Sequence, residues 1–288
     1  MISRRLLRLK MMQILYAYFQ SEDKNIAKFE KELAHSIEKS YELYHLFLVL
    51  MLDIKQYAES RIELGKSKRL PGTDDLNPNL RFLNNRVFNQ ISNNIQLRAY
   101  CKSHPVSWVN YPEFIKNIYL KLIDSEYFKT YMSAPKCSYK DDKALLVYIL
   151  NYLIPESDDL LPILEEQSIY WTDEIEFVIG MVSRTIGDFK ENQGDNAPLM
   201  PLFKNDDDRD FMKRLFRKSV ISDTEFTQLI RQHSDNWEIE RIAFMDIVLM
   251  KMALSEIIEF PSIPIKVSMN EYIELSKYYS TEKSSVLI

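Results

Sequence analysis

The chain has 288 residues, of which 46% are hydrophobic and only five are glycine, and its formal net charge is −5. This composition excludes a disordered chain. It also excludes a protein whose whole surface is basic and binds nucleic acid, so any RNA site must be a local patch. No nucleophile elbow, zinc-protease motif or Walker loop is present, and the four histidines are scattered. We therefore expect a protein that is not an enzyme and has no catalytic residues, metal site or cofactor.

The first predicted helix covers residues 3–20 and is basic at its beginning. Its first turns carry four cations and the helix contains no acidic residue; the cations are Arg4, Arg5, Arg8 and Lys10. Positive charges oppose the helix dipole there, because a helix N-terminus favours anions. The pattern fits either an ordinary solvated face or an anionic partner.

Residues 21–205 are predicted to be a series of amphipathic helices. Apolar residues at helical spacing predict helices over residues 26–64, 79–102, 114–132, 141–153, 160–170 and 171–190. In the second of these stretches, residues 79–102, the asparagines are expected to face solvent: Asn84, Asn85, Asn89, Asn93 and Asn94. The clearest break is residues 191–205, which contain Gly194, Pro198 and Pro201, and we place a domain boundary there.

Several features favour a cytoplasmic location. Cys101 and Cys137 lie far apart without a CxxC pairing, which favours reduced thiols over a disulfide. No apolar run approaches the roughly 18 residues of a membrane helix, and the N-terminus lacks the cleavage site of a signal peptide. We expect no contact with a membrane.

The C-terminal part contains a strongly apolar helix, predicted over residues 237–259. It has almost no polar face, so we expect it to be buried on all sides. Pro261 ends it, and a further amphipathic helix follows. A central helix wrapped by others is the core of an all-α domain.

Short motifs near both ends of the chain carry a family resemblance. They occupy residues 4–8, 13–16, 237–241, 252–256, 263–267, 270–277 and 281–284. These motifs resemble the NusB family of RNA-binding transcription antitermination and ribosomal-RNA biogenesis factors. The resemblance implies a NusB-like helical bundle built around the buried central helix. It would consist of a basic helix at residues 1–20, an inserted helical region at 21–205 and a C-terminal domain at 206–288.

The resemblance also implies partners and a binding surface. Family members bind single-stranded, boxA-like RNA together with NusE, a small-subunit ribosomal protein, in the transcription elongation complex. The matching RNA-facing residues are Arg4, Arg5, Arg8, Lys10, Lys283 and Ser284. Arginine forks can bond phosphate in bidentate fashion or stack on bases, and Lys283 and Ser284 are expected to begin a helix.

Asp246 matches the acid that faces the protein partner in this family. Its neighbours on the central helix are apolar, and a buried carboxylate needs a partner. An intramolecular pair with Lys251 or Arg241 is the alternative, and the sequence leaves both interpretations open.

Two departures from the family pattern bear on function. The family usually continues past the position of Ser284 with a phenylalanine and another helix, whereas this sequence ends at Ile288. The large insertion could cover the RNA surface or form a homodimer interface. A helical scaffold that binds only protein is therefore the alternative function.

Overall fold

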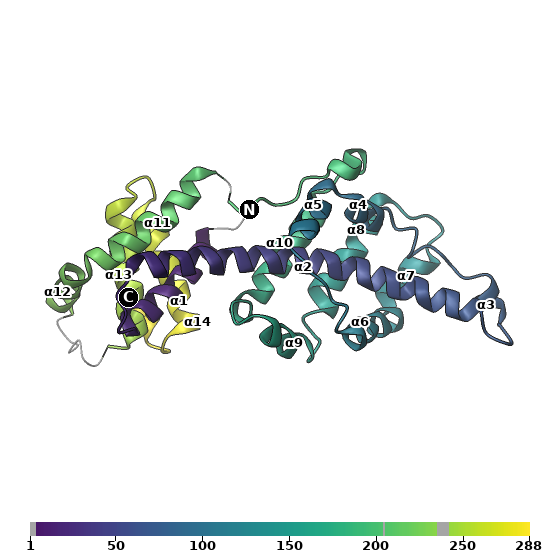
Figure 1. Ribbon diagram of the computed structural model, residues 1–288, viewed down its shortest axis with the longest axis horizontal. Helices are drawn as coiled ribbons and strands as arrows, with labels where there is room; N and C mark the ends of the chain where they lie inside the picture. Colours follow the sequence, from purple (N-terminus) through teal and green to yellow (C-terminus); the bar gives the residue numbers. More distant parts are fainter. Residues whose placement is uncertain (1–3, 204, 235–241) are drawn as a thin grey trace. The chain divides into compact units, whose positions relative to one another are not determined.

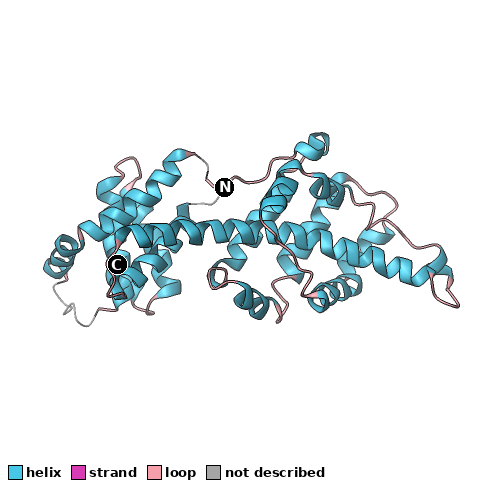
Figure 2. Ribbon diagram, in the orientation of Figure 1, coloured by secondary structure: helices cyan, strands magenta, loops and turns pink. Residues whose placement is uncertain are grey.

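The computed structural model describes residues 4–203, 205–234 and 242–288, apart from the side chain of Asp74. These residues form helices and no strand, so the expected all-α class is confirmed (Figure 2). No helix within the described ranges is long and apolar enough to cross a membrane. The contacts divide the chain into two compact units, Met1–Glu38 with Pro201–Ile288, and Lys39–Met200. The boundaries predicted from the sequence lie instead after residues 20 and 205.

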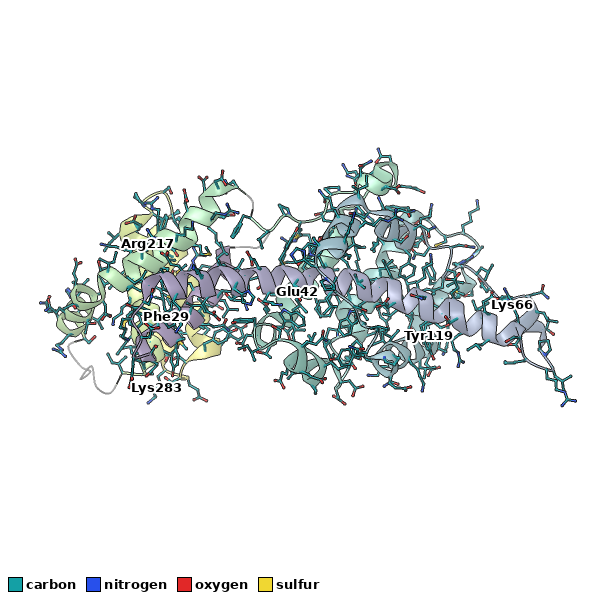
Figure 3. The ribbon with its side chains drawn as sticks, viewed as in Figure 1. Phe29, Glu42, Lys66, Tyr119, Arg217 and Lys283 are labelled. Atoms are coloured by element: carbon teal, nitrogen blue, oxygen red, sulfur yellow. The ribbon has the colours of Figure 1, made fainter. Side chains whose placement is uncertain are left out.

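The first unit is organised around helix α13. Its helices, all but the last of them labelled in Figure 1, are α1 (Arg4–Gln20), the start of α2 (Ile26–Lys66), α11 (Asp206–Ile221), α12 (Asp223–His233), α13 (Phe244–Glu259), α14 (Ile265–Tyr279) and α15 (Ser284–Leu287). Helix α13 packs against α1, α11, α12 and α14. Arg217 of α11, labelled in Figure 3, donates from Nη2 to Glu30 Oε2 of α2 over 2.9 Å. The central helix expected from the sequence is therefore present.

The central helix is not buried on all sides. Val248, Leu249 and Met252 are fully buried, but Ile258 is 52% exposed. Another side of the helix lines a cavity of about 550 Å³ together with α12 and the chain end. The predicted start of this helix at residue 237 lies outside the described residues, and α13 begins at Phe244.

A buried ion pair joins α1 to α13. Arg8 donates to Glu256 from Nε over 2.8 Å and from Nη2 over 2.6 Å. The same carboxylate accepts hydroxyl hydrogen bonds from Ser268 (2.6 Å) and Tyr272 (2.7 Å) of α14. Burial raises the pKa of Glu256, but its four bonds outweigh this and hold the pKa below its ordinary value. Three helices thus meet at one carboxylate.

The second unit is built around residues 39–66 of α2. Its other elements are α3 (Thr73–Leu76), α4 (Arg86–Asn93), α5 (Ile95–Ser103), α6 (Pro112–Asp124), α7 (Glu126–Ser133), α8 (Tyr139–Tyr148), the π-helix η1 (Ile149–Leu153), α9 (Leu160–Gln167), η2 (Thr172–Glu174), α10 (Ile175–Asp188) and η3 (Glu191–Asn196). Helix α10 packs on α8 and η1. The hydroxyls of Tyr44 on α2 and Thr185 on α10 are hydrogen-bonded in the interior over 2.8 Å.

Two of the predicted long helices are broken by capping residues. The stretch at 79–102 divides at Asn94, whose side chain accepts from the N–H of Leu97, and the stretch at 114–132 divides at Ser125. Asn85 and Asn94 are buried and cap helices, so the expectation that they face solvent was wrong. Apolar periodicity continued across both breaks, because short side chains that bond the backbone start a new helix without disturbing the pattern.

We expect Glu256→Ala to lower the free energy of unfolding of the first unit by about 3–5 kcal/mol, because it leaves the Arg8 guanidinium buried without its partner. Denaturant unfolding measures the change. Glu274→Ala is the matched control, since Glu274 forms an exposed pair with Lys277 one turn away. Equal effects of the two substitutions would contradict a structural role for the buried pair.

Candidate nucleic-acid and partner interface

The beginning of α1 presents two arginines at the surface. Arg5 is exposed. Arg4 is 39% exposed in its side chain, and its Nε donates to Asp208 Oδ1 of α11 over 3.1 Å. The Arg4 guanidinium also lies over the Phe211 ring, 5.0 Å from its centroid. Arg5 therefore offers a guanidinium to an anion directly. Arg4 would bind an anion only with the groups that its ion pair with Asp208 leaves unoccupied, or after that ion pair breaks.

The structure places Arg8 and Lys10 in the interior, not on the basic surface expected from the sequence. Arg8 is 3% exposed and Lys10 is 1% exposed. Arg8 is held by Glu256, and its Nη1 also lies 3.6 Å from Glu271 of α14. Four cations close together in sequence thus divide into an outer pair and an inner pair, because α1 is buried all round from Leu6 to Met12, whereas its beginning is at the surface.

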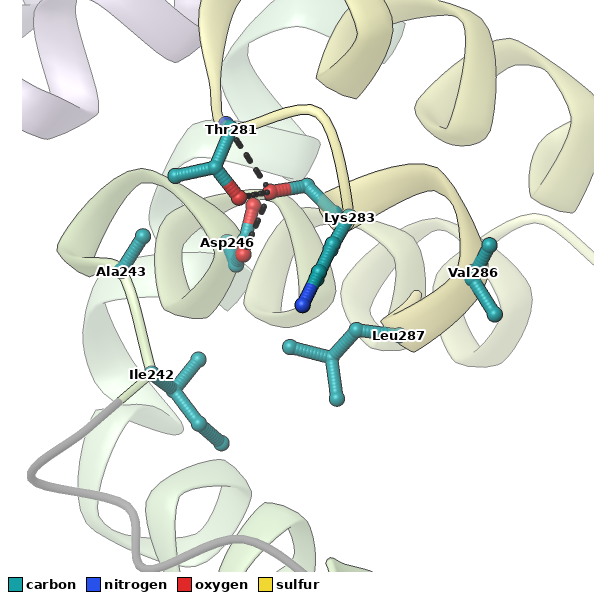
Figure 4. A pocket seen from close by; sticks show the side chains of 8 residues that line it. Ile242, Ala243, Asp246, Thr281, Lys283, Val286 and Leu287 are labelled. Atoms are coloured by element: carbon teal, nitrogen blue, oxygen red, sulfur yellow. Dashed lines mark hydrogen bonds between the residues drawn. The ribbon is translucent and has the colours of Figure 1, made fainter.

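Asp246 lines a cavity at the other end of α13. Ser284 donates its hydroxyl to Asp246 Oδ2 over 2.8 Å (Figure 4). Ser284 Oγ also lies 2.8 Å from Thr281 Oγ1 and accepts from the Thr281 N–H over 3.0 Å. Among the described residues, Oδ1 of Asp246 has no hydrogen-bond partner although the residue is 2% exposed. The carboxylate therefore has one oxygen engaged and one that is buried without a described partner.

The cavity beside Asp246 has a volume of about 500 Å³ and a mixed lining. Lys283 is exposed at its edge, and Figure 4 shows its amine on the same side as Ile242 and Leu287. Ser284 is itself buried, and the helix that it begins, α15, is only four residues long. Lys283, not Ser284, is accordingly the group that this segment presents to solvent.

The intramolecular pair that was the alternative for Asp246 does not involve Lys251. Lys251 forms its ion pair with Asp223 at the start of α12. Arg241, the other candidate, lies outside the described residues. The partner that the structure gives Asp246 is the Ser284 hydroxyl.

The predicted site residues do not form one cluster. Arg8 reaches Glu256 near the end of α13, whereas the segment with Lys283 is tied to Asp246 in its first turn. The two anchor points are about ten residues apart, which corresponds to roughly 15 Å along a helix. An extended ligand could touch both ends, but a single phosphate group could not.

The sequence analysis missed the Glu256 network. A glutamate inside an apolar helix was a signal, because a buried carboxylate needs cations or hydrogen-bond donors. Tyr272 and Ser268, spaced for one face of the next helix, supply two of them. Among the described residues, no group of three or more histidine, cysteine or acidic side chains could hold a metal ion.

We expect Ser284→Ala to destabilise the first unit by about 1–3 kcal/mol, because it removes the hydroxyl hydrogen bond to the buried Asp246 carboxylate. Chemical denaturation tests this. Val286→Ala is the control, since Val286 is 89% exposed on the same short helix. A loss no larger than that of the control would show that the hydroxyl does not support Asp246.

Comparisons with known proteins identify the family of the C-terminal part. Residues 184–288 match the model of the NusB family. Similar proteins named transcription antitermination protein NusB come from Salinibacter ruber (42% identical over 89 residues, 31% of this chain and 56% of that protein), Chloroherpeton thalassium (38% over 80 residues, 28% and 38%) and Listeria monocytogenes serotype 4a (36% over 83 residues, 29% and 65%). The aligned part thus spans between 38% and 65% of these relatives.

No solved structure matches the chain. The family match extends from within α10 to the end of the chain, so it includes α13 and the cavity beside Asp246. The part of this chain that is similar to the NusB family is therefore residues 184–288.

Proposed function

We propose that this chain is a transcription antitermination factor that binds single-stranded, boxA-like RNA together with NusE. The observation that supports the proposal most is the NusB family match at residues 184–288, together with relatives named for antitermination. RNA and partner binding are what the family resemblance implies. Because the chain aligns with only part of each relative, the activity itself is a proposal.

The basic groups that would contact RNA are Arg5, Arg4 and Lys283. Arg5 and Lys283 are exposed, and Arg4 is partly exposed beside the Phe211 ring. Guanidinium and ammonium groups bind phosphates, and the strand would need to extend between the two ends of α13. Three other residues were also predicted to face RNA: Arg8, Lys10 and Ser284. All three are buried, so they would stabilise the helices that carry the exposed groups and would not contact RNA themselves. Binding, not catalysis, is the proposed activity.

The cavity beside Asp246 is the proposed contact for the protein partner. Its carboxylate has one buried oxygen without a described hydrogen-bond partner, and apolar side chains form part of the cavity lining. A donor group on an apolar stem from NusE would complete the hydrogen bonding of Asp246. The transcription elongation complex would then be reached through this partner.

The second candidate function is a helical scaffold that binds only protein. It is favoured by the burial of Arg8 and Lys10, which leaves half of the predicted cations of α1 at the surface. Binding of labelled boxA-like RNA and of a scrambled RNA, each with and without NusE, distinguishes the two functions. Antitermination requires preference for the boxA-like RNA that increases with NusE, and a scaffold shows none.

We expect Arg5→Ala with Lys283→Ala to weaken RNA binding and to reduce the salt slope by about 1.4, since each phosphate contact contributes about 0.7 on a single strand. Fluorescence anisotropy over a series of salt concentrations measures the slope. Lys129→Ala is the control, an exposed lysine of the second unit. An unchanged slope in the double variant would contradict the proposed surface.

We expect Asp246→Asn to weaken NusE binding by roughly tenfold, the loss typical of one hydrogen bond to a charged group. Calorimetric titration of NusE into each variant measures it. Glu282→Gln removes an exposed acid from the neighbouring segment and should bind as the unaltered chain does. If both variants lose affinity equally, general charge and not the cavity attracts the partner.

A further inference from the structure

The second unit contains a small cavity whose walls come from α2 and α6. Its volume is about 390 Å³. One wall is a single face of α2, because its residues are spaced by three or four positions: Asp53, Gln56, Tyr57 and Ser60. The opposite wall comes from the α5–α6 loop and the start of α6: Ser107, Val109, Pro112 and Ile115. The cavity thus has a polar side and an apolar side.

Trp108 fixes the loop that forms the second wall. It is fully buried, and its Nε1–H donates to the Leu46 carbonyl of α2 over 2.8 Å. Its ring stacks on Phe114 of α6 at 5.1 Å between centroids. Because the tryptophan between Ser107 and Val109 is anchored in the core, the cavity is formed before any ligand arrives, which lowers the entropy lost on binding.

Asp53 is half-buried in this cavity without a cation. It forms no ion pair with any described residue, and burial raises its pKa to about 6, opposed only by a hydrogen bond from the Trp108 backbone. Asp142, in the same unit, is the contrast. Arg86 Nε lies 2.7 Å from the Asp142 carboxylate, and this ion pair helps to lower the pKa of Asp142 despite its burial. Asp53 is thus an acid that lacks the partner such groups usually have.

None of the neighbouring charged and titratable groups acts as a counter-ion for Asp53. They are Tyr57 and Arg61 on α2, His104 before the loop, and Glu113, Lys116 and Tyr119 on α6. Lys116 is paired with Glu113 at 2.8 Å, and His104 Nδ1 lies 2.9 Å from Ser103 Oγ. Tyr119, labelled in Figure 3, packs edge-on against Tyr57 with a distance of 5.4 Å between ring centroids. None of these charges contributes to the pKa of Asp53.

We propose that this cavity binds an alkyl ammonium or guanidinium group, with Asp53 as its counter-ion. The cation would receive oxygen acceptors from the α2 wall and the Ser107 hydroxyl, and the Tyr57 ring could add a cation–π contact. Val109 and Ile115 would pack against the alkyl stem, as apolar surfaces do with lysine and arginine. A free alkylamine and a lysine or arginine side chain of a protein share this chemistry.

The binding test uses n-butylammonium, N-acetyl-lysine methylamide and, as an anionic control, butyrate. Ligand-observed NMR at pH 7.5 should show that the full chain binds the two cations and not butyrate. Asp53→Asn should weaken cation binding at least tenfold, while Glu59→Gln, which removes an exposed acid of α2 outside the cavity lining, should not. Tighter binding of the lysine derivative assigns the site to a protein side chain, and tighter binding of butylammonium assigns it to a free amine. Equal binding to the unaltered chain and Asp53→Asn would overturn the proposal.

The pH dependence provides a second readout. Cation binding should weaken as the pH falls below about 6, because protonation removes the charge of Asp53. Since the folded-state pKa is raised above the ordinary value of 3.8, the carboxylate lowers stability as the pH rises from about 4 to about 6. Asp53→Asn should therefore melt at a higher temperature than the unaltered chain above pH 6, with no difference near pH 4. A lower melting temperature above pH 6 would show that Asp53 already has a partner and would overturn the proposal.

Discussion

The ion pair between Arg8 and Glu256 is the interaction on which the NusB-like part of this chain depends. Two charges removed from water are costly, and only complete hydrogen bonding offsets that cost. Here the carboxylate accepts two bonds from the guanidinium and one each from Ser268 and Tyr272. Because these donors come from the first helix and from α14, the pair fixes both helices against α13 at once.

This arrangement gives the basic first helix two separate roles. Its inner cations, Arg8 and Lys10, belong to the interior, and its outer ones, Arg4 and Arg5, remain at the surface. A helix that begins with several arginines is unfavourable for its own dipole. In this chain part of that cost is offset inside the protein, by Glu256 and by Asp208, and so it is not by itself evidence of an external anion.

The sequence predicted the helical class and the extent of α1 and α2 well, because long apolar periodicity is a strong signal. It did not predict the ends of α4 and α6, since Asn94 and Ser125 cap new helices within an uninterrupted periodic pattern. It also assigned Arg8 to the surface. Charge alone suggests exposure, and the matching acid lies 248 positions away along the chain, so only the fold reveals the pair. The partner of Asp246 was missed for the same reason.

Asn94, between α4 and α5, limits how this region can change over evolution. Its N–H closes α4 on Ile91, its side-chain oxygen opens α5 at Leu97, and its amide reaches the Ala197 carbonyl over 2.7 Å. One residue ends a helix, begins the next and ties both to a distant segment. An inserted or deleted residue at this junction would break at least one of these bonds. Insertions and deletions in related sequences should therefore accumulate in the loop after α2 and not at this position.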